Sequence, residues 1–592
     1  MWPAADKVLY TSGRSSRLTM NPVVLPNPLP ANLGDHVRDI YRRHFAHELA
    51  LGTVKPLVIP HGVLVTFGLP ILYLAIPHRN RPWLFRARYL LMFYIIVFNL
   101  RETFMTTSPN FAVGYAVGLM QAWGIVWNMT LLILMRPQFD AERVEIRPVR
   151  ATPVASGAAN GATNGHVRIS DSKENVRPVQ NGNANAVTKV NGTSKAPAHS
   201  AKSTGDKSAD APDEDIAKSL DEGYEYYWQD YPEDAPFLTR LEWSFDLFTS
   251  FRGTGWNWSV PVIPHFAKPD KPHSAALADL ESIPMSTKQG YHRFATRRSW
   301  LRSELLPIIV GYLALDAFSV LMMKDPYFIL GPEYTASTVP VPLPPLLAAL
   351  PPWLLFTYRS LTGFLAVMAA ISTIMKLWQL ICAFPLRGLL GARADLWHYP
   401  TLYGSFTSNV LDKGLAGFWG GWWHQTFRVA FSAPGAWLAR RGILADRHSP
   451  AAKAAAGFFA FAQSGFLHSL GSASCLPPSL PWAPPIFFML SWVGILLQTA
   501  VCGAARPVTR SLPRWARRAG NFAFVFVWLN ATQYWMLDDI ARSGIWLLEP
   551  VPASLFRALG LGGPGDHWWR WTWAELPRRY AGAHWWEGGI AL

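Results

Sequence analysis

The chain has 592 residues, of which 50% are hydrophobic and only 16% are charged, against about 25% charged residues in an ordinary soluble domain. This composition excludes a soluble globular enzyme and indicates a membrane protein. The net charge of +15 does not indicate a nucleic-acid-binding protein, because the basic residues gather beside long apolar runs.

Residues 1–139 form an N-terminal region with three predicted membrane spans, at 58–76, 89–100 and 111–135. A helical span needs about 20 mostly apolar residues. The first 20 residues lack the apolar core of a signal peptide. We therefore expect the first span to target the chain to the membrane.

Residues 140–223 differ sharply from the region before them. They contain no Phe, Tyr or Trp, and their first Leu is Leu220. Such a segment cannot bury enough apolar surface to offset its chain entropy. We therefore predict a disordered loop on the cytosolic side.

Residues 224–303 are rich in aromatic side chains. Leu241, Phe245 and Phe248 recur at helical spacing, and the glycines of "RGTGWNW" should end that helix. An amphipathic interfacial helix followed by a tryptophan-rich turn is expected here. Two interpretations remain open, namely aromatic anchoring at the membrane surface and a wall of a ligand channel.

Residues 304–540 carry five further predicted spans, at 305–323, 361–384, 454–470, 486–504 and 522–529, and 541–592 form a C-terminal tail. The expected fold is therefore all-α, a polytopic transmembrane helical bundle of roughly eight spans with amphipathic interfacial helices. Basic clusters follow alternate spans, which puts those ends in the cytosol. The basic residues Arg38, Arg42 and Arg43 conflict with this scheme, because their segment would then face the lumen.

The three cysteines have no metal-ligand spacing and no disulfide pattern. We interpret Cys382, Cys475 and Cys502 as core residues and predict no metal site.

His468 lies in "FFAFAQSGFLHSLGS" (458–472), a segment otherwise suited to hydrocarbon. On a helix its neighbours are mostly Gly and Ser, which lets another helix or a slender ligand approach closely. A histidine hydrogen-bonded between packed helices is the structural alternative. Intramembrane ionisable groups are usually functional, and a buried neutral imidazole can act as a general base.

A second histidine, His424, lies in "FTSNVLDKGLAGFWGGWWHQTFR" (406–428). If this stretch is helical, its Phe and Trp side chains form one stripe and His424 shares a glycine-lined face with Gly420 and Gly421. Two adjacent glycines suggest that something packs close to the backbone there. The alternative is an interfacial helix anchored by tryptophans.

These two stretches, with "SG..H" around His468 and "FW…WH" before His424, resemble the wax synthase branch of the membrane-bound O-acyltransferase superfamily. "DLFTSFRGTGWNW" is similar to a segment of its fungal members, and the resemblance covers roughly residues 225–540. The superfamily often has Asn where this chain has His424. Its charged pair between "FW" and "WH" is replaced here by Gly420 and Gly421.

The resemblance implies a membrane-embedded O-acyltransferase of acyl-CoA and an alcohol. In that scheme His468 deprotonates the acceptor alcohol, and His424 orients the thioester or donates a proton to its carbonyl oxygen. Other residues around these motifs are then assigned to substrate binding, namely Trp419, Trp423, Gln425, Arg428, Ser464 and Asn409.

Acyl-CoA is then a co-substrate and no cofactor is needed. It would enter from the cytosolic side, near Arg428, Arg440 and Arg441. The other partners are a hydrophobic alcohol and the lipid bilayer, with no nucleic acid. We expect an integral membrane protein of the endoplasmic reticulum.

The acceptor suggested by the fungal segment is a terpenoid or meroterpenoid alcohol of secondary metabolism, and the acyl group is acetyl. A long-chain alcohol, giving a wax ester, is the first alternative. A proton-coupled transporter is the second, with His468 and the intramembrane Asp316 as a proton path.

Overall fold

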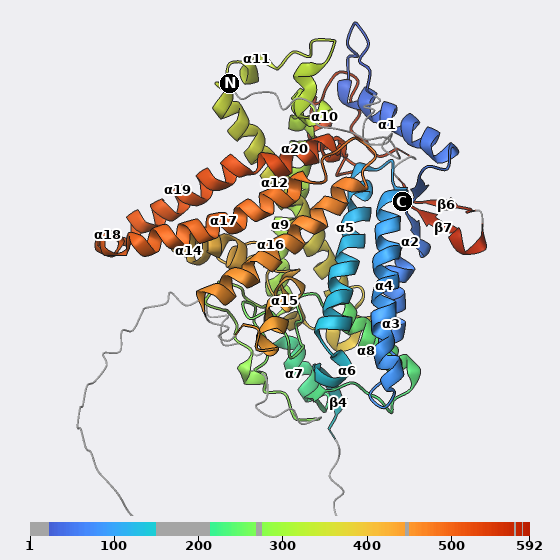
Figure 1. Cartoon of the computed structure of the whole chain (residues 1–592), viewed down its shortest axis with the longest axis vertical. Helices are drawn as coiled ribbons and strands as arrows, with labels where there is room; N and C mark the ends of the chain where they lie inside the picture. Colours follow the sequence, from blue (N-terminus) through green and yellow to red (C-terminus); the bar gives the residue numbers. More distant parts are fainter. Residues whose placement is uncertain (1–22, 150–212, 268–274, 445–448, 573–575, 583) are drawn as a thin grey trace, which may run out of the picture. The chain divides into compact units, whose positions relative to one another are not determined.

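The computed structural model describes residues 23–149, 213–267, 275–444, 449–572, 576–582 and 584–592 (Figure 1). Most of these residues are helical, and the few strands are short. The described residues of 23–147 and 213–592 belong to one compact unit. The centre of the predicted disordered loop, 150–212, lies outside the described residues.

Five helices in the described part of the chain are long and apolar enough to cross a membrane. They are α4 (Pro82–Met105), α5 (Phe111–Asn128) with its π-helical extension η2 (Met129–Leu134), α9 (Arg297–Met322), α12 (Pro352–Ala383) and α17 (Ala483–Ala504). These helices confirm a helical bundle of membrane-spanning type.

The prediction of eight spans is not confirmed. The run at 58–76 is split into the short helices α2 (His61–Val63), η1 (Leu64–Gly68) and α3 (Leu69–Leu74). The runs at 454–470 and 522–529 lie on α16 (Pro450–Ala473) and α19 (Arg514–Thr532), which are long but less apolar. α16 packs against α5, α15 (Arg428–Arg440) and α17, so much of its surface meets protein.

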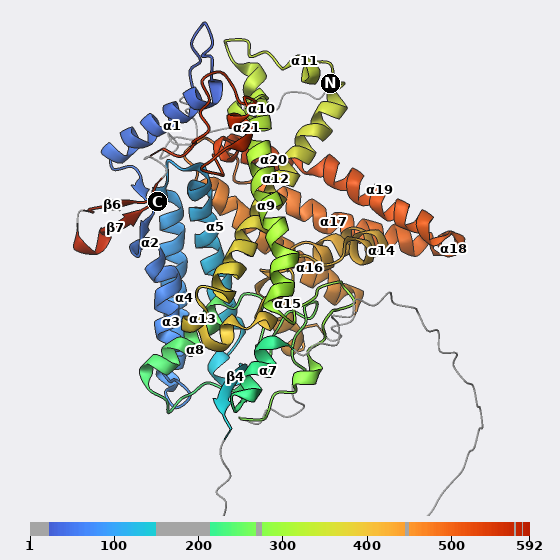
Figure 2. The same ribbon diagram turned by 180° about the vertical axis from the view of Figure 1, so that it is seen from behind.

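Helices α4 and α5 run side by side, and α16 crosses α5 and lies alongside α17 (Figures 1 and 2). The contact between α5 and α16 is very close, since a Cβ at Gly118 would clash with the carbonyl of Leu470. The hydroxyl of Ser474 accepts a hydrogen bond from the Gly118 amide (2.9 Å) and donates one to the Gly114 carbonyl (2.7 Å). Small residues therefore hold these two helices together.

Helix α8 (Phe237–Thr249) confirms the helix predicted around Leu241–Phe248. Gly253 and Gly255 follow it with φ of 62° and 80°, a conformation that favours glycine. Trp256 is buried, and the Trp258 ring lies 6.1 Å from that of Trp127 on α5. The tryptophan-rich turn is therefore part of the protein interior and not a membrane-surface anchor.

Both ends of the segment 140–223, which was predicted to be disordered, are ordered. β4 (Arg143–Pro148) pairs with β5 (Tyr224–Gln229), and α7 (Glu214–Asp221) is helical. Ion pairs order these segments, since Arg143 binds Glu242 (2.6 Å) and Arg293 binds Asp213 (2.6 Å). Composition alone could not show these partners.

At the other end of the bundle lie α1 (Leu33–Ala50), α10 (Pro326–Leu330), α20 (Tyr534–Arg542) and α21 (Leu555–Ala558), the last of which is labelled in Figure 2 (Figures 1 and 2). This end is opposite to α6 (Pro137–Asp140) and its basic neighbours. The basic residues Arg38, Arg42 and Arg43, which conflict with the predicted orientation of the spans, all lie on α1. Of these, Arg38 is buried and bound to Glu549 (2.6 Å).

The described residues of 541–592 belong to this end. The strand β7 (Gly589–Ala591) pairs antiparallel with β2 (Val58–Ile59) and β6 (Arg578–Tyr580), and β1 (Lys55–Pro56) pairs parallel with β3 (Thr106–Thr107). The remaining short helices are η3 (Leu280–Ser282), η4 (Pro332–Ala336), α11 (Pro345–Ala348), α13 (Arg387–Leu390), η5 (Gly391–Ala394), η6 (Leu396–His398), η7 (Thr407–Leu411), α14 (Asp412–Gly417), η8 (Phe418–Trp422), α18 (Arg506–Ser511), η9 (Ile545–Leu547) and η10 (Trp585–Glu587).

Candidate active site

His468 lies near the carboxyl end of α16, between α5 and α17. The helix begins where the Ser449 side chain accepts a hydrogen bond from the amide of Ala452 (3.1 Å). Its small residues contact other helices, since Gly465 meets Pro485 and Gly471 meets the ring of Tyr115. The face of small residues predicted around His468 therefore serves helix packing at Gly465 and Gly471.

The His468 imidazole has two defined neighbours. Its Nδ1 lies 2.9 Å from the hydroxyl oxygen of Tyr115 on α5, and its ring stacks on Phe488 of α17 with centroids 5.1 Å apart. The same Tyr115 hydroxyl reaches the backbone carbonyl of His468 at 3.4 Å. Nδ1 is thus engaged with a buried side chain, and Nε2 is the nitrogen that remains for chemistry.

His424 does not lie on a helix, so the helical arrangement considered for 406–428 does not extend to this residue. η8 ends at Trp422, Trp423 is extended (φ −58°, ψ 149°), and α15 begins only at Arg428. The Gln425 amide donates to the carbonyls of Trp419 (3.0 Å) and Trp423 (2.5 Å). Gln425 thereby satisfies carbonyls that a continuing helix would have bound.

The turn presents His424 between aromatic rings. Its imidazole lies 5.1 Å from Trp423 and 5.7 Å from Phe427 by ring centroids. The Nδ1 atom is buried and has no hydrogen-bond partner among the residues that the structure describes. A buried polar atom in this state is a common sign of a ligand or water site.

The two histidines converge on one aromatic wall. The Trp419 ring contacts Phe461 on α16 and Phe488 on α17, and Phe488 is the ring on which His468 stacks. His424 joins the same wall through Trp423, whose ring lies 6.1 Å from that of Trp419 and 5.1 Å from that of His424 by centroids. The structure therefore brings together His424, His468 and Trp419, which sequence reasoning had placed on separate motifs.

Asn409 explains one of the paired glycines. It is fully buried, and its amide donates to the carbonyls of Gln289 (2.8 Å) and Ser405 (2.8 Å). A Cβ at Gly421 would clash with the Asn409 side chain, whereas one at Gly420 would meet nothing within 4 Å. The close packing predicted beside His424 is thus provided, at Gly421, by the protein's own Asn409 side chain.

The other residues assigned to substrate binding surround this turn. Arg428 donates to the carbonyl of Gly420 (2.5 Å) and to the side chain of Gln425 (2.8 Å). Trp423 stacks on Phe418, and Ser464 lies half-buried on α16 one turn before His468. Their proposed contacts with substrate stay predictions.

Sequence reasoning missed two residues of this region, Tyr115 and Arg252. Arg252 donates to the carbonyls of Pro400 (3.1 Å) and Thr401 (2.9 Å), and it interacts electrostatically with His424. In the described part of the chain neither Arg252 nor Arg428 has a carboxylate partner. Arg252 belongs to "RGTGWNW", in which the glycines and tryptophans are the more conspicuous residues.

Other buried polar atoms around His424 also lack partners among the described residues. They are the side-chain polar atoms of Trp258, Tyr291, Tyr403, Trp419 and Thr426. Unpaired buried groups cost free energy, so natural proteins rarely cluster them without a function. Together with the two uncompensated guanidinium groups, they suit a polar, anionic ligand.

Asp316, by contrast, lies in a separate structural cluster. Its carboxylate accepts hydrogen bonds from the Ser554 hydroxyl (2.5 Å) and the Phe556 amide (3.2 Å), and Arg557 lies 4.0 Å away. It fixes the segment after α20 to α9. This anchoring role does not require a proton path.

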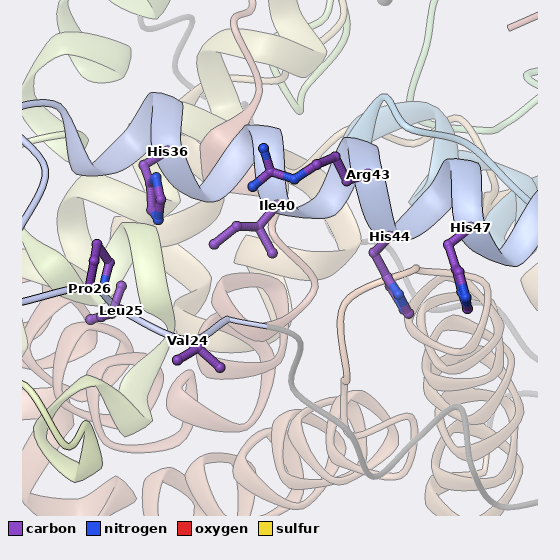
Figure 3. Close-up of a pocket in the computed structure, with 8 residues that line it drawn as sticks. All are labelled: Val24, Leu25, Pro26, His36, Ile40, Arg43, His44 and His47. Atoms are coloured by element: carbon purple, nitrogen blue, oxygen red, sulfur yellow. The ribbon is translucent and has the colours of Figure 1, made fainter.

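A hollow of about 550 Å³ lies along α1 and shares no lining residue with the histidine pair. Figure 3 shows His36, Ile40, His44 and His47 on the side of α1 that faces residues 24–26. Within the described residues, no group of three or more His, Cys, Asp or Glu side chains lies close enough to hold a metal ion.

Comparisons with known proteins point to one family. Residues 399–490, which include both histidines but neither Tyr115 nor Arg252, match the family described as membrane bound O-acyl transferase. The chain is 26% identical over 338 residues to acetyltransferase pyr8 of Aspergillus fumigatus, covering 55% of this chain and 70% of that protein.

Two further acetyltransferases are similar. Ple2 of Rhodocybe pseudopiperita is 25% identical over 318 residues (53% of this chain, 70% of that protein). SpyB of Aspergillus fumigatus is 26% identical over 302 residues (48% and 45%). No solved structure matches the chain significantly.

Proposed function

We propose that this chain, an O-acyltransferase of the membrane bound O-acyl transferase family, transfers an acetyl group from acetyl-CoA to the hydroxyl of a hydrophobic alcohol. The acceptor we infer is a terpenoid or meroterpenoid of secondary metabolism. The relatives are named acetyltransferases, which supports the acetyl donor. The membrane is that of the endoplasmic reticulum.

The observation that carries this proposal is the meeting of His424 and His468 at the aromatic wall around Trp419 and Phe488. A thioester is already activated, so acyl transfer to an alcohol needs a base, donors for the oxyanion and a dry site. Transmembrane helices and aromatic rings exclude the water that would hydrolyse the thioester.

In the proposed mechanism His468 is the general base and Tyr115 positions it. The Tyr115 hydroxyl donates to the His468 carbonyl and accepts a hydrogen bond from Nδ1–H, which leaves the lone pair of Nε2 free. Nε2 takes the proton of the alcohol as its oxygen attacks the thioester carbonyl. The tetrahedral intermediate then expels the CoA thiolate, which receives that proton from His468.

The negative charge that develops on the carbonyl oxygen needs donors. The indole N–H of Trp419 and the imidazole of His424 are buried and lack partners for these atoms within the described residues. Arg252 and Arg428 add positive potential on the same side. This set favours an anionic donor such as acyl-CoA and stabilises the oxyanion.

The test is acetyl transfer by the full chain in microsomes with labelled acetyl-CoA. A panel of terpenoid, sterol and long-chain alcohols would serve as acceptors. We expect an acetyl ester with terpenoid alcohols and none from His468→Ala. Preference for a long-chain acyl donor and a fatty alcohol would favour the wax ester alternative, and equal product from both proteins would remove His468 from the mechanism.

A further inference from the structure

A second hollow of about 560 Å³ lies where α4 begins and where η2 and α15 end, and the proposed mechanism does not use it. Three separate segments of the chain line it. Its polar side chains are Arg88 from α4, Arg136 and Asp140 from the end of the η2 span, and Arg440 and Arg441 from the end of α15.

The lining carries a strong excess of positive charge. Asp140 is its one carboxylate among the described residues, and both of its oxygens bind Arg136 at 3.0 Å. Arg440 donates one hydrogen bond to the carbonyl of Leu134 (2.8 Å). Arg441 lies over the ring of Trp437 at 4.9 Å. In the described part of the chain neither of these two guanidinium groups has a carboxylate partner.

The position of the hollow fits the boundary between lipid and water. Ile133, Leu134 and Met135 form its apolar wall. On α4 beside it, Trp83 and Leu90 are 72% and 75% exposed, which is typical of a surface that meets lipid. Basic clusters mark this end of the spans as the cytosolic one, where anionic lipids are concentrated.

We propose that this pocket binds the phosphate of an anionic phospholipid headgroup. Arginine forks suit phosphate oxygens, and basic pockets between membrane helices on the cytosolic side are known to accept such headgroups. The positive-inside rule alone predicts scattered charges, whereas here four arginines from distant segments converge on one hollow.

The acyl donor is a weaker match for this pocket. Arg440 and Arg441, which sequence reasoning placed beside the acyl-CoA entrance, lie at the opposite end of α15 from Arg428. A helix of 13 residues is about 18 Å long. The pocket shares no lining residue with the histidine site, so the proposal is independent of the proposed function.

The test is lipid binding by the full chain in detergent, followed by native mass spectrometry. Phosphatidylinositol phosphate and phosphatidylcholine are the probes, and the variant is Arg440→Gln with Arg441→Gln. We expect the wild type to retain the anionic lipid selectively, and the variant to bind it about tenfold more weakly. The matched control is Arg506→Gln with Arg510→Gln on α18, which removes two exposed charges outside the pocket and should change little.

Three results would overturn the proposal. Equal losses in the variant and the control would show general surface attraction. Displacement of the lipid by inorganic phosphate at equal concentration would show a site for free phosphate. Unchanged lipid binding with a raised KM for acetyl-CoA would place these arginines on the path of the donor. Arg441→Gln alone provides a milder change if the double variant is unstable.

Discussion

Two buried polar regions of this protein look alike in sequence and differ in their partners. Around Asp316, the charged groups of Arg557, Glu549 and Arg570 all form ion pairs. Around His424, the imidazole Nδ1 and the indole N–H of Trp419 lack partners among the described residues, and Arg252 has no carboxylate partner there.

The difference teaches how to interpret an ionisable residue in a membrane segment. A cluster whose charges all find partners within the protein contributes to the fold. A buried cation with no carboxylate partner can instead hold an anion. The region of Asp316 is structural by this measure, because its charges are paired although Arg570 Nε and Glu549 Oε2 lack hydrogen bonds within the described residues, and the histidine region is the candidate site.

The largest expected effect is on turnover when the base is removed. His468→Ala should lower kcat by about 10²–10⁴-fold, because the alcohol loses its proton acceptor. The melting temperature of the variant should stay close to that of the wild type. The measurement is ester formation per folded molecule, and near-wild-type turnover would contradict the assignment.

Substitution of Asp316, in the structural cluster, should lower the stability of the fold and leave turnover unchanged. Asp316→Ala leaves Arg557 buried with one partner fewer and should cost about 3 kcal/mol. Detergent-purified protein should unfold at a lower temperature, with kcat per folded molecule unchanged. A selective loss of turnover with normal stability would return Asp316 to a functional role.

A smaller effect is expected from Tyr115→Phe, which keeps the ring against Gly471 and removes the hydroxyl. Loss of this hydrogen bond should reduce kcat about tenfold and shift its pH profile, with the KM for acetyl-CoA nearly unchanged. The control is Tyr231→Phe, whose hydroxyl donates to the Ala75 carbonyl outside the site. Equal effects of both variants would make Tyr115 merely structural.

The smallest effect concerns Asp395, a buried carboxyl outside the membrane spans. It accepts hydrogen bonds from Tyr226 (3.0 Å) and Trp397 (3.3 Å). Burial, together with repulsion from Asp215, raises its pKa to about 7. The unfolded chain ionises this group at a pKa of about 3.9, so its contribution to stability falls as pH rises from about 4 to about 7.

Asp395→Asn removes that titration. The melting temperature of the variant should therefore depend less on pH between 5 and 8 than that of the wild type, as a thermal shift series would show. Parallel curves would mean that Asp395 is ionised at neutral pH in the folded protein.

Much of the fold could be predicted from apolar runs, because seven of the eight predicted runs lie on long helices and the first, 58–76, is split among a short strand and three short helices. The number of spans could not, since α16 is largely surrounded by protein and need not be strongly apolar. The ordered ends of the 140–223 segment depend on ion pairs such as Arg293 with Asp213, which join distant parts of the chain.

The histidine pair could be found because both residues stand out in apolar, glycine-rich stretches. The bend that carries His424 could not, since it depends on Gln425 binding the carbonyls of Trp419 and Trp423. Tyr115 could not be found either, because nothing in its span marks one tyrosine as the partner of a histidine 353 positions away.

The interlock between Gly118 and Leu470 limits how substrates can reach His468. The backbone of α5 at Gly118 lies directly against the backbone of α16 at Leu470. Separating the two helices would also break the hydrogen bonds of the Ser474 hydroxyl to Gly118 and Gly114. In the proposed reaction, the acceptor alcohol would therefore have to reach His468 from a side other than the contact between α5 and α16. The contact between α5 and α16, which orients the His468 imidazole through Tyr115, therefore also closes this side of the site.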